Sequence, residues 1–359
     1  MQRSYRPSSD VFVAPTFIRI KKQLLLNGDV VISSANSMEL VGKNILWNKD
    51  ENDVSFGGFL TIVRTSNGLV LHPEFLSLIY QYLFETGYFA NIATQTTNIA
   101  NLTNKKLNEI PFPIPPLAEQ HRIVAKLEES FAEIDRAEEA YRELQTLTDV
   151  LRKKILQEAV MGKLVPQLDG EPAVEQIGEK SEDVPFSIPE KWKWYRLNQA
   201  GNFISGYTPA KNLLSNNGDI PYFKVSDMNT PGNEVHLRIT SAYIKSNSSN
   251  RFTPANTIVY PKNGGAIFTN KRRIVDNNSV VDTNTGGFVP GPLLTTEYSY
   301  LFFKIIDFRK LSKGTTLPTI DQAKLKNYLI PIPPIDEQWR IVSKVEELMK
   351  NVDRLVEMN

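Results

Sequence analysis

The sequence predicts an α+β protein in which two domains of mixed strands and short helices are separated by long helices that form an antiparallel coiled coil. Three observations predict this class. One segment occurs twice, a long stretch has helical periodicity without a helix breaker, and short β-branched runs alternate with Asn, Gly and Asp turns. The chain has 359 residues, which is enough for two domains with ordinary hydrophobic cores.

The internal repeat sets the domain organisation. Residues Pro113–Glu129 recur as Pro331–Glu347, and both copies contain Pro-Ile-Pro-Pro, Glu-Gln and Arg-Ile-Val in the same register. The match continues upstream, where Lys106-Leu107 recurs as Lys324-Leu325. A period this long indicates duplicated domains rather than a solenoid. The repeated unit is therefore a globular domain followed by a proline-rich turn and a helix.

Five segments follow one another in this organisation. They are a first domain (1–116), a long spacer helix (117–162), a linker (163–184), a second domain (185–330) and a shorter second helix (331–359). The alternating prolines fix an extended entry into each helix, and the Glu that follows lies in the first turn, where the helix dipole favours it. Gly, Pro and acidic residues mark 163–184 as a linker.

The spacer helix needs a partner for its apolar stripe. From Leu117 onward apolar residues recur mostly every three or four positions, and neither Pro nor Gly occurs before Gly162. A helix of about 45 residues would be about 67 Å long, which exceeds what one globular domain needs. The second helix, about 25 residues long, offers a matching stripe that begins at Ile341 and Val342. The alternative is that each helix packs only on its own domain.

Charge is distributed unevenly along a chain whose formal net charge is only +1. Residues 185–330 contain 18 Lys and Arg against 9 Asp and Glu, whereas 117–184 contain 9 against 16. A basic domain beside an acidic helical segment is typical of a DNA-reading domain on a protein-binding stalk. Chance clustering on solvated surfaces is the simpler alternative.

No residue pattern indicates catalysis. The chain has no cysteine, which excludes disulfides, thiolate nucleophiles and Cys-based zinc sites. The three histidines, His72, His121 and His236, have no metal-ligand spacing, and no glycine-rich phosphate loop follows a strand. We therefore expect no catalytic residue, no metal and no cofactor. The absence of a long apolar run predicts no membrane contact and a cytoplasmic protein.

The second domain supplies residues of the kinds that bind DNA. Basic side chains neutralise phosphates, while Asn and Arg can make paired hydrogen bonds to base edges. The predicted DNA-binding residues are Asn270, Lys271, Arg272, Arg273, Tyr207, Lys211, Asn216, Asn217, Lys245 and Arg251. For each cluster taken alone, an exposed loop without a ligand is the alternative.

These motifs resemble a known family. The repeated Pro-Ile-Pro-Pro-x-x-Glu-Gln-x-Arg-Ile-Val with its long helix resembles the conserved regions of the specificity subunit of type I restriction-modification systems. Residues Pro185–Leu197, Ser205–Pro209 and Gly218–Tyr222 are similar to the opening of the target-recognition domains of that family. The resemblance covers nearly the whole chain.

The resemblance implies a non-catalytic subunit whose two target-recognition domains read the halves of a split site in double-stranded DNA. The helices would dock methyltransferase (modification) subunits, probably two, and the restriction subunit would join through the complex. The helix starts that match the family are assigned to scaffold and partner contact: Glu119, Gln120, Arg122, Glu337, Gln338 and Arg340. Cofactor and catalysis would belong to the other subunits.

Two departures suggest a specificity subunit that is shortened at both ends. The first domain has no counterpart of the segment that opens at Pro185, and the second helix is about half the length of the first. The alternative function is therefore a targeting-deficient interaction protein that binds the modification subunit through its coiled coil.

Overall fold

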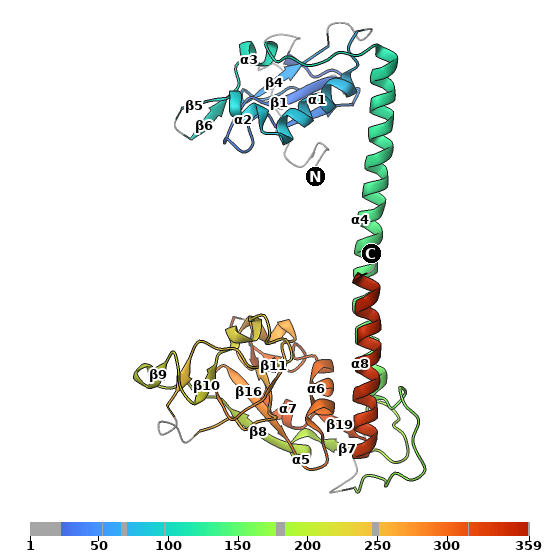
Figure 1. Cartoon of the computed structure of the whole chain (residues 1–359), viewed down its shortest axis with the longest axis vertical. Coiled ribbons are helices and arrows are strands. Elements are labelled where there is room, and N and C mark those ends of the chain that lie inside the picture. Colours follow the sequence, from blue (N-terminus) through green and yellow to red (C-terminus); the bar gives the residue numbers. More distant parts are fainter. Residues whose placement is uncertain are drawn as a thin grey trace. The chain divides into compact units, whose positions relative to one another are not determined.

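The computed structural model describes residues 23–51, 53–65, 70–96, 98–176, 184–245, 251–314 and 316–357 (Figure 1). Residues 1–22 of the predicted first domain and 177–183 of the predicted linker lie outside these ranges. The chain divides into two compact units, 1–139 and 140–359, so that the division falls within the long helix. Each unit has its own hydrophobic core.

The first unit contains an antiparallel sheet of order β3-β1-β4. Its strands are β1 (Asp29–Ser33), β3 (Asn44–Trp47) and β4 (Leu60–Val63), and helix α1 (Pro73–Glu85) packs on it. Side chains alternate along β1, as a strand requires. Val30 and Ile32 join the core with α1, whereas Val31 packs with Trp47 on the other face.

A second small sheet completes this unit. It has the order β2-β6-β5, with bounds Ala35–Asn36, Ile99–Asn101 and Thr94–Thr96, and is followed by α3 (Asn104–Asn108). Helix α2 (Tyr88–Ile92) places Phe89 in the core. Gly42 is needed beside it, because its φ is +87° and a Cβ there would lie 2.4 Å from the Phe89 side chain.

The second unit is built on a five-stranded sheet of order β11-β14-β13-β16-β8. In that order the strands are His236–Leu237, Arg273–Val275, Ile258–Pro261, Thr285–Pro290 and Gly201–Ser205. Helix α6 (Thr296–Ile305) covers it, and Tyr260, Phe288 and Phe303 stack between the helix and the sheet. The aromatic core covers one face of β13, and Val259 on the other face packs in a separate cluster with Phe223 and Val275, so the central strand is buried on both sides.

A smaller sheet of order β15-β10-β12-β9 lies next in the same unit. Its strands are Val280–Val281, Ile220–Phe223, Tyr243–Ile244 and Leu214–Ser215. The remaining elements are β7 (Lys193–Arg196), α5 (Leu197–Ala200), η4 (Lys211–Leu213), η5 (Val225–Asn229), η7 (Gly265–Thr269), β17 (Ser312–Lys313), β18 (Thr319–Ile320), α7 (Gln322–Lys326) and β19 (Leu329–Ile332). Because β7 pairs with β19, the start and the end of the domain are joined.

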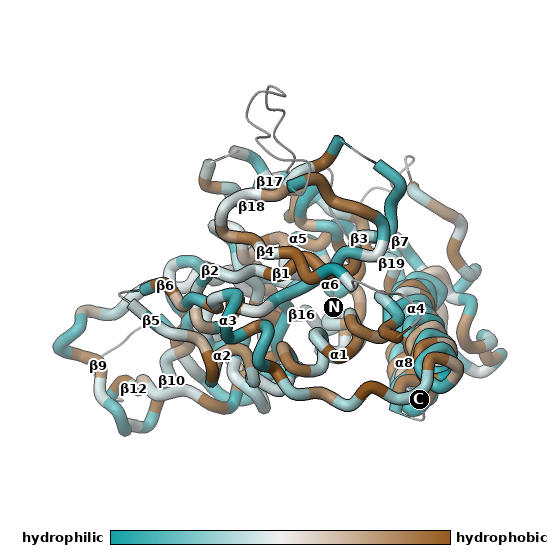
Figure 2. The backbone as a smooth tube through the Cα atoms, turned by 90° about the horizontal axis from the view of Figure 1, so that it is seen from above, coloured by the Kyte–Doolittle hydropathy of each residue, from teal (hydrophilic) through white to brown (hydrophobic). Residues whose placement is uncertain are grey.

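The long helices pair within the second unit. Helix α4 spans Leu117–Val160 and α8 spans Ile335–Glu357. Arg152 of α4 pairs with Asp353 near the end of α8 at 2.7 Å, while Ile155 shares a core with Ile341 and Val345. The C-terminal part of α4 therefore runs antiparallel to α8 (Figure 1), which confirms the predicted coiled coil. Hydrophilic and hydrophobic residues follow one another along both helices (Figure 2), as expected of helices with one buried face.

The described ranges hold no helix whose length and apolar character would suit a membrane crossing. Within the same ranges, no group of three or more His, Asp or Glu side chains is arranged to hold a metal ion.

Candidate nucleic-acid interface

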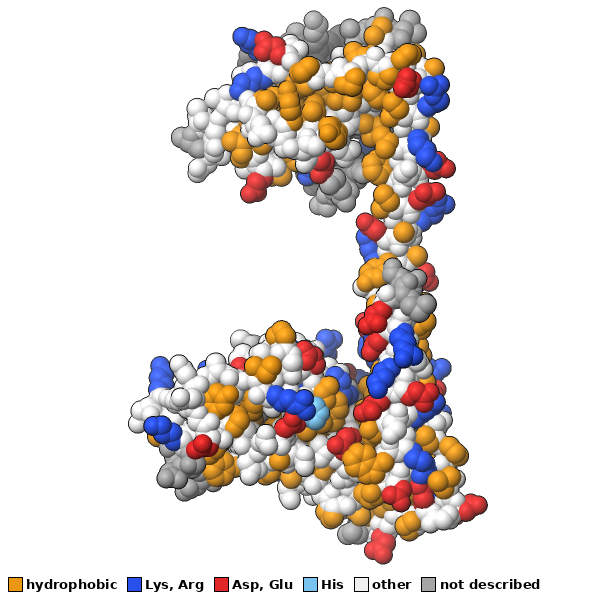
Figure 3. Space-filling model, viewed as in Figure 1, with side chains coloured by type: hydrophobic (Ala, Val, Ile, Leu, Met, Phe, Trp, Pro, Cys, Tyr) orange, Lys and Arg blue, Asp and Glu red, His pale blue; other side chains and the backbone are white. Residues whose placement is uncertain are grey.

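The small sheet of the second unit presents cations and amides at its ends. Strands β9 and β12 are antiparallel, with Ser215 opposite Tyr243, so Lys211 before β9 and Lys245 after β12 emerge at the same end. At the other end of β9 lie the exposed amides of Asn216 and Asn217. Lys and Arg side chains project from the tip of the domain near β9 (Figure 3). All four predicted side chains are exposed and available to a ligand.

Tyr207 and Arg251 meet on the same small sheet. The guanidinium of Arg251 lies 5.9 Å from the centroid of the Tyr207 ring, within cation–π range. The Tyr207 N–H donates to the Val281 carbonyl at 2.9 Å, which fixes the loop against β15. Gly206 permits this approach, because a Cβ there would lie 2.1 Å from the Asp282 carbonyl oxygen. The structure thus groups six of the ten predicted residues around one sheet.

Arg272 is buried rather than exposed. Its side chain is 1% accessible, and its guanidinium lies 3.5 Å from the Phe308 ring centroid. Its Nε and Nη2 donate to the carbonyls of Phe303 and Ile306 at the end of α6, at 3.1 and 3.3 Å. Burial lowers the pKa of Arg272 to about 9, so it stays protonated at neutral pH. Arg272 therefore caps the C-terminal end of α6, where the helix dipole favours a cation.

Arg273 is buried as well. It donates to the carbonyls of Arg272 and Met228, at 2.8 and 2.5 Å, and burial lowers its pKa. These positions contradict the prediction that Arg272 and Arg273 contact DNA, because their donors face carbonyl groups inside the domain. A run of basic residues reveals charge, but whether its members are buried depends on the segments that pack around them, here the end of α6 and the η5 turn at Met228.

The other two residues of that cluster lie at the surface. Asn270 has a left-handed backbone with φ of +51°, and its side chain donates to the Lys304 carbonyl at 3.0 Å. The half-buried Lys271 donates its amine to the Asn229 side chain. Both belong to the loop between η7 and β14, apart in topology from the sheet that carries Tyr207 and Lys211.

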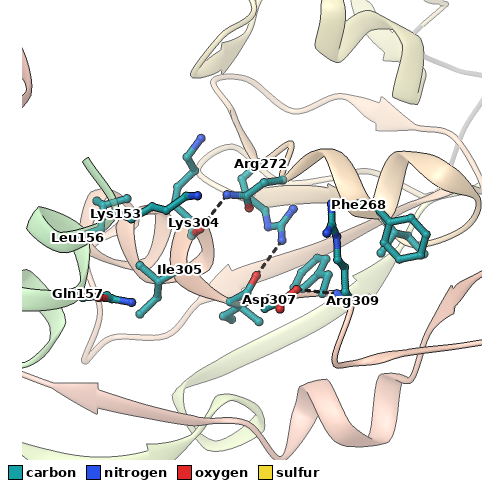
Figure 4. A pocket seen from close by; sticks show the side chains of 13 residues that line it. Lys153, Leu156, Gln157, Phe268, Arg272, Lys304, Ile305, Asp307 and Arg309 are labelled. Atoms are coloured by element: carbon teal, nitrogen blue, oxygen red, sulfur yellow. Dashed lines mark hydrogen bonds between the residues drawn. The ribbon is translucent and has the colours of Figure 1, made fainter. Parts of the chain in front are cut away.

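A pocket of about 480 Å³ lies beside Arg272 (Figure 4). Its lining comes from α4, from the loop around η7 and from the end of α6 with the turn that follows. The side chains labelled around it are Lys153, Leu156, Gln157, Phe268, Arg272, Lys304, Ile305, Asp307 and Arg309. No sequence pattern predicted Lys153, Lys304 and Arg309 as neighbours, because α4, α6 and the turn after α6 contribute them and no local motif connects these positions.

Gln338 fixes the start of α8 to its domain. The side chain is completely buried, and its Nε2 donates to the carbonyls of Leu293 and Pro333 at 2.8 and 2.9 Å. Its Oε1 accepts the N–H of Thr295, the N-cap residue of α6, at 2.7 Å. With these three hydrogen bonds the buried amide of Gln338 connects the start of α8 to the start of α6.

Gln120 makes the same set of bonds in the first unit. It is also completely buried, donates to the carbonyls of Val70 and Pro115, and accepts the N–H of His72, each at 2.8 Å. His72 is the N-cap residue of α1. The repeated glutamine therefore joins each domain to its helix, and its burial leaves it no surface for a partner.

The charged neighbours of these glutamines differ between the copies. Arg340 pairs with Glu171 of the linker and donates to the Pro166 carbonyl at 3.1 Å, and this pairing lowers the pKa of Glu171. Glu337 is completely buried at the start of α8, and burial raises its pKa. Glu119 and Arg122 of the first copy are exposed, with no ion pair among the described residues. Of the six predicted scaffold residues, these two remain open to a partner.

Comparisons with known proteins agree with this organisation. The family described as the type I restriction modification DNA specificity domain matches residues 9–145 and 189–357, one match for each repeat. Among curated proteins, the type I restriction enzyme EcoAI specificity subunit of Escherichia coli is 27% identical over 68% of this chain and 54% of its own length. The StySPI specificity subunit of Salmonella potsdam is 22% identical over 96% of this chain and 72% of its own.

Solved structures share the fold. The HsdS subunit from Thermoanaerobacter tengcongensis superposes with a TM-score of 0.61 at 19% identity, covering 94% of this chain and 76% of that one. A chain from a structure that describes assembly of the type I R-M system gives a TM-score of 0.68, also at 19% identity, over 93% and 77% of the two chains. The chain spans about half the length of the EcoAI relative.

Proposed function

Since this chain belongs to the type I restriction-modification DNA specificity family, we propose that it is a sequence-specific DNA-recognition subunit that reads a bipartite site and is itself non-catalytic. The observation that carries the proposal is the group of exposed side chains on the small sheet of the second domain. Lys211, Lys245 and Arg251 can neutralise phosphates. The amides of Asn216 and Asn217 each carry a donor and an acceptor that complement the N7 acceptor and the N6–H donor of adenine in the major groove.

The partners of this proposal are double-stranded DNA and type I methyltransferase subunits, with the restriction subunit joining through that complex. Its support is the acidic character of α4, on which Glu119 and Arg122 are exposed while the neighbouring Gln120 is used internally. Helix α8 pairs with the C-terminal part of α4, whereas most side chains of α4 between Glu119 and Glu139 are exposed. That surface is where we place methyltransferase docking.

Replacing Lys211 and Lys245 together with Gln is expected to weaken binding of the full chain to duplex DNA about tenfold at low salt. Each lost phosphate contact should also reduce the slope of log affinity against log salt by about 0.9. Fluorescence anisotropy with a labelled duplex across a salt series measures both quantities. The matched control is Lys326→Gln with Lys350→Gln, two exposed lysines on α7 and α8.

The slope decides the outcome. If the Lys211/Lys245 variant keeps the slope of the unmodified chain, these lysines do not contact phosphates and the small sheet is not the interface. If the control variant loses as much slope as the Lys211/Lys245 variant, binding is unspecific attraction of DNA to exposed lysines anywhere on the surface. A chain without measurable DNA affinity that still binds its methyltransferase subunit would instead support the targeting-deficient interaction protein.

A further inference from the structure

The pocket beside Arg272 concentrates positive charge that its one acidic side chain, Asp307, offsets only in part. Four cationic side chains line the pocket, namely Arg272, Lys153, Lys304 and Arg309. Asp307 is the one carboxylate among the lining residues (Figure 4). Within the described ranges none of these four cations has an ion pair. Arg272 donates its hydrogen bonds to backbone carbonyl groups. Unneutralised cations around a cavity repel one another and favour an anion between them.

Lys304 lies within the positive field of this cluster. Burial lowers its pKa, and the positive charges of Arg273 and Arg272 lower it further. Its amine lies 5.9 Å from the centroid of the Tyr300 ring, within cation–π range. A bound anion would relieve this repulsion. The buried pair Arg272 and Arg273 thus acts on the pocket through its field while its donors stay inside the domain.

The outer cations are free to reach a ligand. Lys153 and Arg309 are exposed, and the guanidinium of Arg309 lies 5.8 Å from the Phe268 ring, which is 40% accessible. Asp307 is engaged by the Arg309 backbone, whose N–H donates to its carboxylate at 3.0 Å. The single acid of the pocket is therefore oriented toward the backbone, which leaves the amines and the guanidinium to an anion.

Size and chemistry select the ligand. A volume of about 480 Å³ lies in the range of small-molecule sites and exceeds what a single halide or water would need. Two lysines around a guanidinium match the several oxygens of a phosphate group, which bind such donors through charge-assisted hydrogen bonds. The side chain of Gln157 adds a neutral donor from the same face of α4.

We propose that this pocket, formed where α4 meets the second domain, binds a phosphate group through Lys153, Lys304 and Arg309. The phosphate comes either from the backbone of DNA, in which case the inference rests on the proposed function, or from a small phosphate compound. Because α4 supplies one wall, an occupied pocket would bridge the helix and the domain and hold them together.

Titration of the full chain with inorganic pyrophosphate and, separately, with a 30-base-pair duplex tests the proposal. The variant is Lys153→Gln with Arg309→Gln, both exposed, and the control is Lys326→Gln with Lys350→Gln. We expect the first variant to bind at least one of the two probes about tenfold more weakly, and the control to bind both normally. Circular dichroism and thermal unfolding verify that both variants are folded.

The two probes separate the sources. If the unmodified chain binds pyrophosphate and the Lys153/Arg309 variant does not, the ligand is a small phosphate compound. This result supports the pocket even if the chain does not bind duplex DNA. Weakened duplex binding without any pyrophosphate binding identifies a DNA phosphate. If the variant binds both probes as the unmodified chain does, or if neither probe binds the unmodified chain, the pocket is no phosphate site. Normal duplex binding by the variant would leave the proposed function intact.

Discussion

Replacing Gln338 with Ala is expected to lower the free energy of unfolding of the second domain by about 3 kcal/mol, because a buried amide with three hydrogen bonds is lost. The Thr295 N–H and two carbonyls would stay buried without a partner, and a small cavity would remain. Urea unfolding followed by tryptophan fluorescence measures the change, since Trp192 is buried in the same core.

The matched control is Gln145→Ala on α4, where the side chain is exposed. That variant should change the free energy by less than about 0.5 kcal/mol. Gln120→Ala should act on the first unit as Gln338→Ala acts on the second, because the bonds are the same. A Gln338→Ala variant as stable as Gln145→Ala would show that the glutamine does not fix helix to domain.

Replacing Arg272 with Ala is expected to destabilise the second domain by about 4 kcal/mol. The change removes the cation from Phe308, leaves the carbonyls of Phe303 and Ile306 without donors and opens a cavity under α6. Arg272→Met should cost less, because it keeps volume against Phe308 while still removing the donors. The same urea unfolding measurement applies.

Lys271→Ala is the control for this series, because the side chain is only half-buried at the domain surface. It should cost less than about 1 kcal/mol. From most to least destabilising, the expected order is Arg272→Ala, Arg272→Met and Lys271→Ala. An Arg272→Ala variant that unfolds like the unmodified domain, yet binds DNA more weakly, would restore Arg272 to the DNA interface.

The repeat made much of the architecture predictable. Identical side chains in one register, such as Gln120 and Gln338, imply identical surroundings, and the structure gives both the same hydrogen-bond pattern. Helical periodicity likewise predicted α4 and its pairing with α8, because a continuous apolar stripe must be buried against something. The sequence did not reveal that the glutamines face inward, since a polar residue at a helix start is usually solvated.

The candidate site was harder to predict. The amide-rich loops predicted Lys211, Asn216 and Lys245 as DNA-binding residues, and strand pairing brings the three to one small sheet. The prediction that Arg272 and Arg273 are exposed was wrong, because a charged residue in a sequence does not show whether the fold places its side chain inside or outside. The cations of the pocket come from α4 and from the turn after α6, and only the tertiary fold connects such segments.

The central claim, that the chain selects a DNA sequence without reacting on it, is tested most directly by selection from random-sequence duplexes. The full chain together with the proposed methyltransferase subunit is incubated with the pool, and the bound fraction is sequenced. Enrichment of one motif in two separated parts, with the duplexes recovered intact, is the predicted result. Recovery of a pool indistinguishable from the input, from a complex that still assembles, would contradict it.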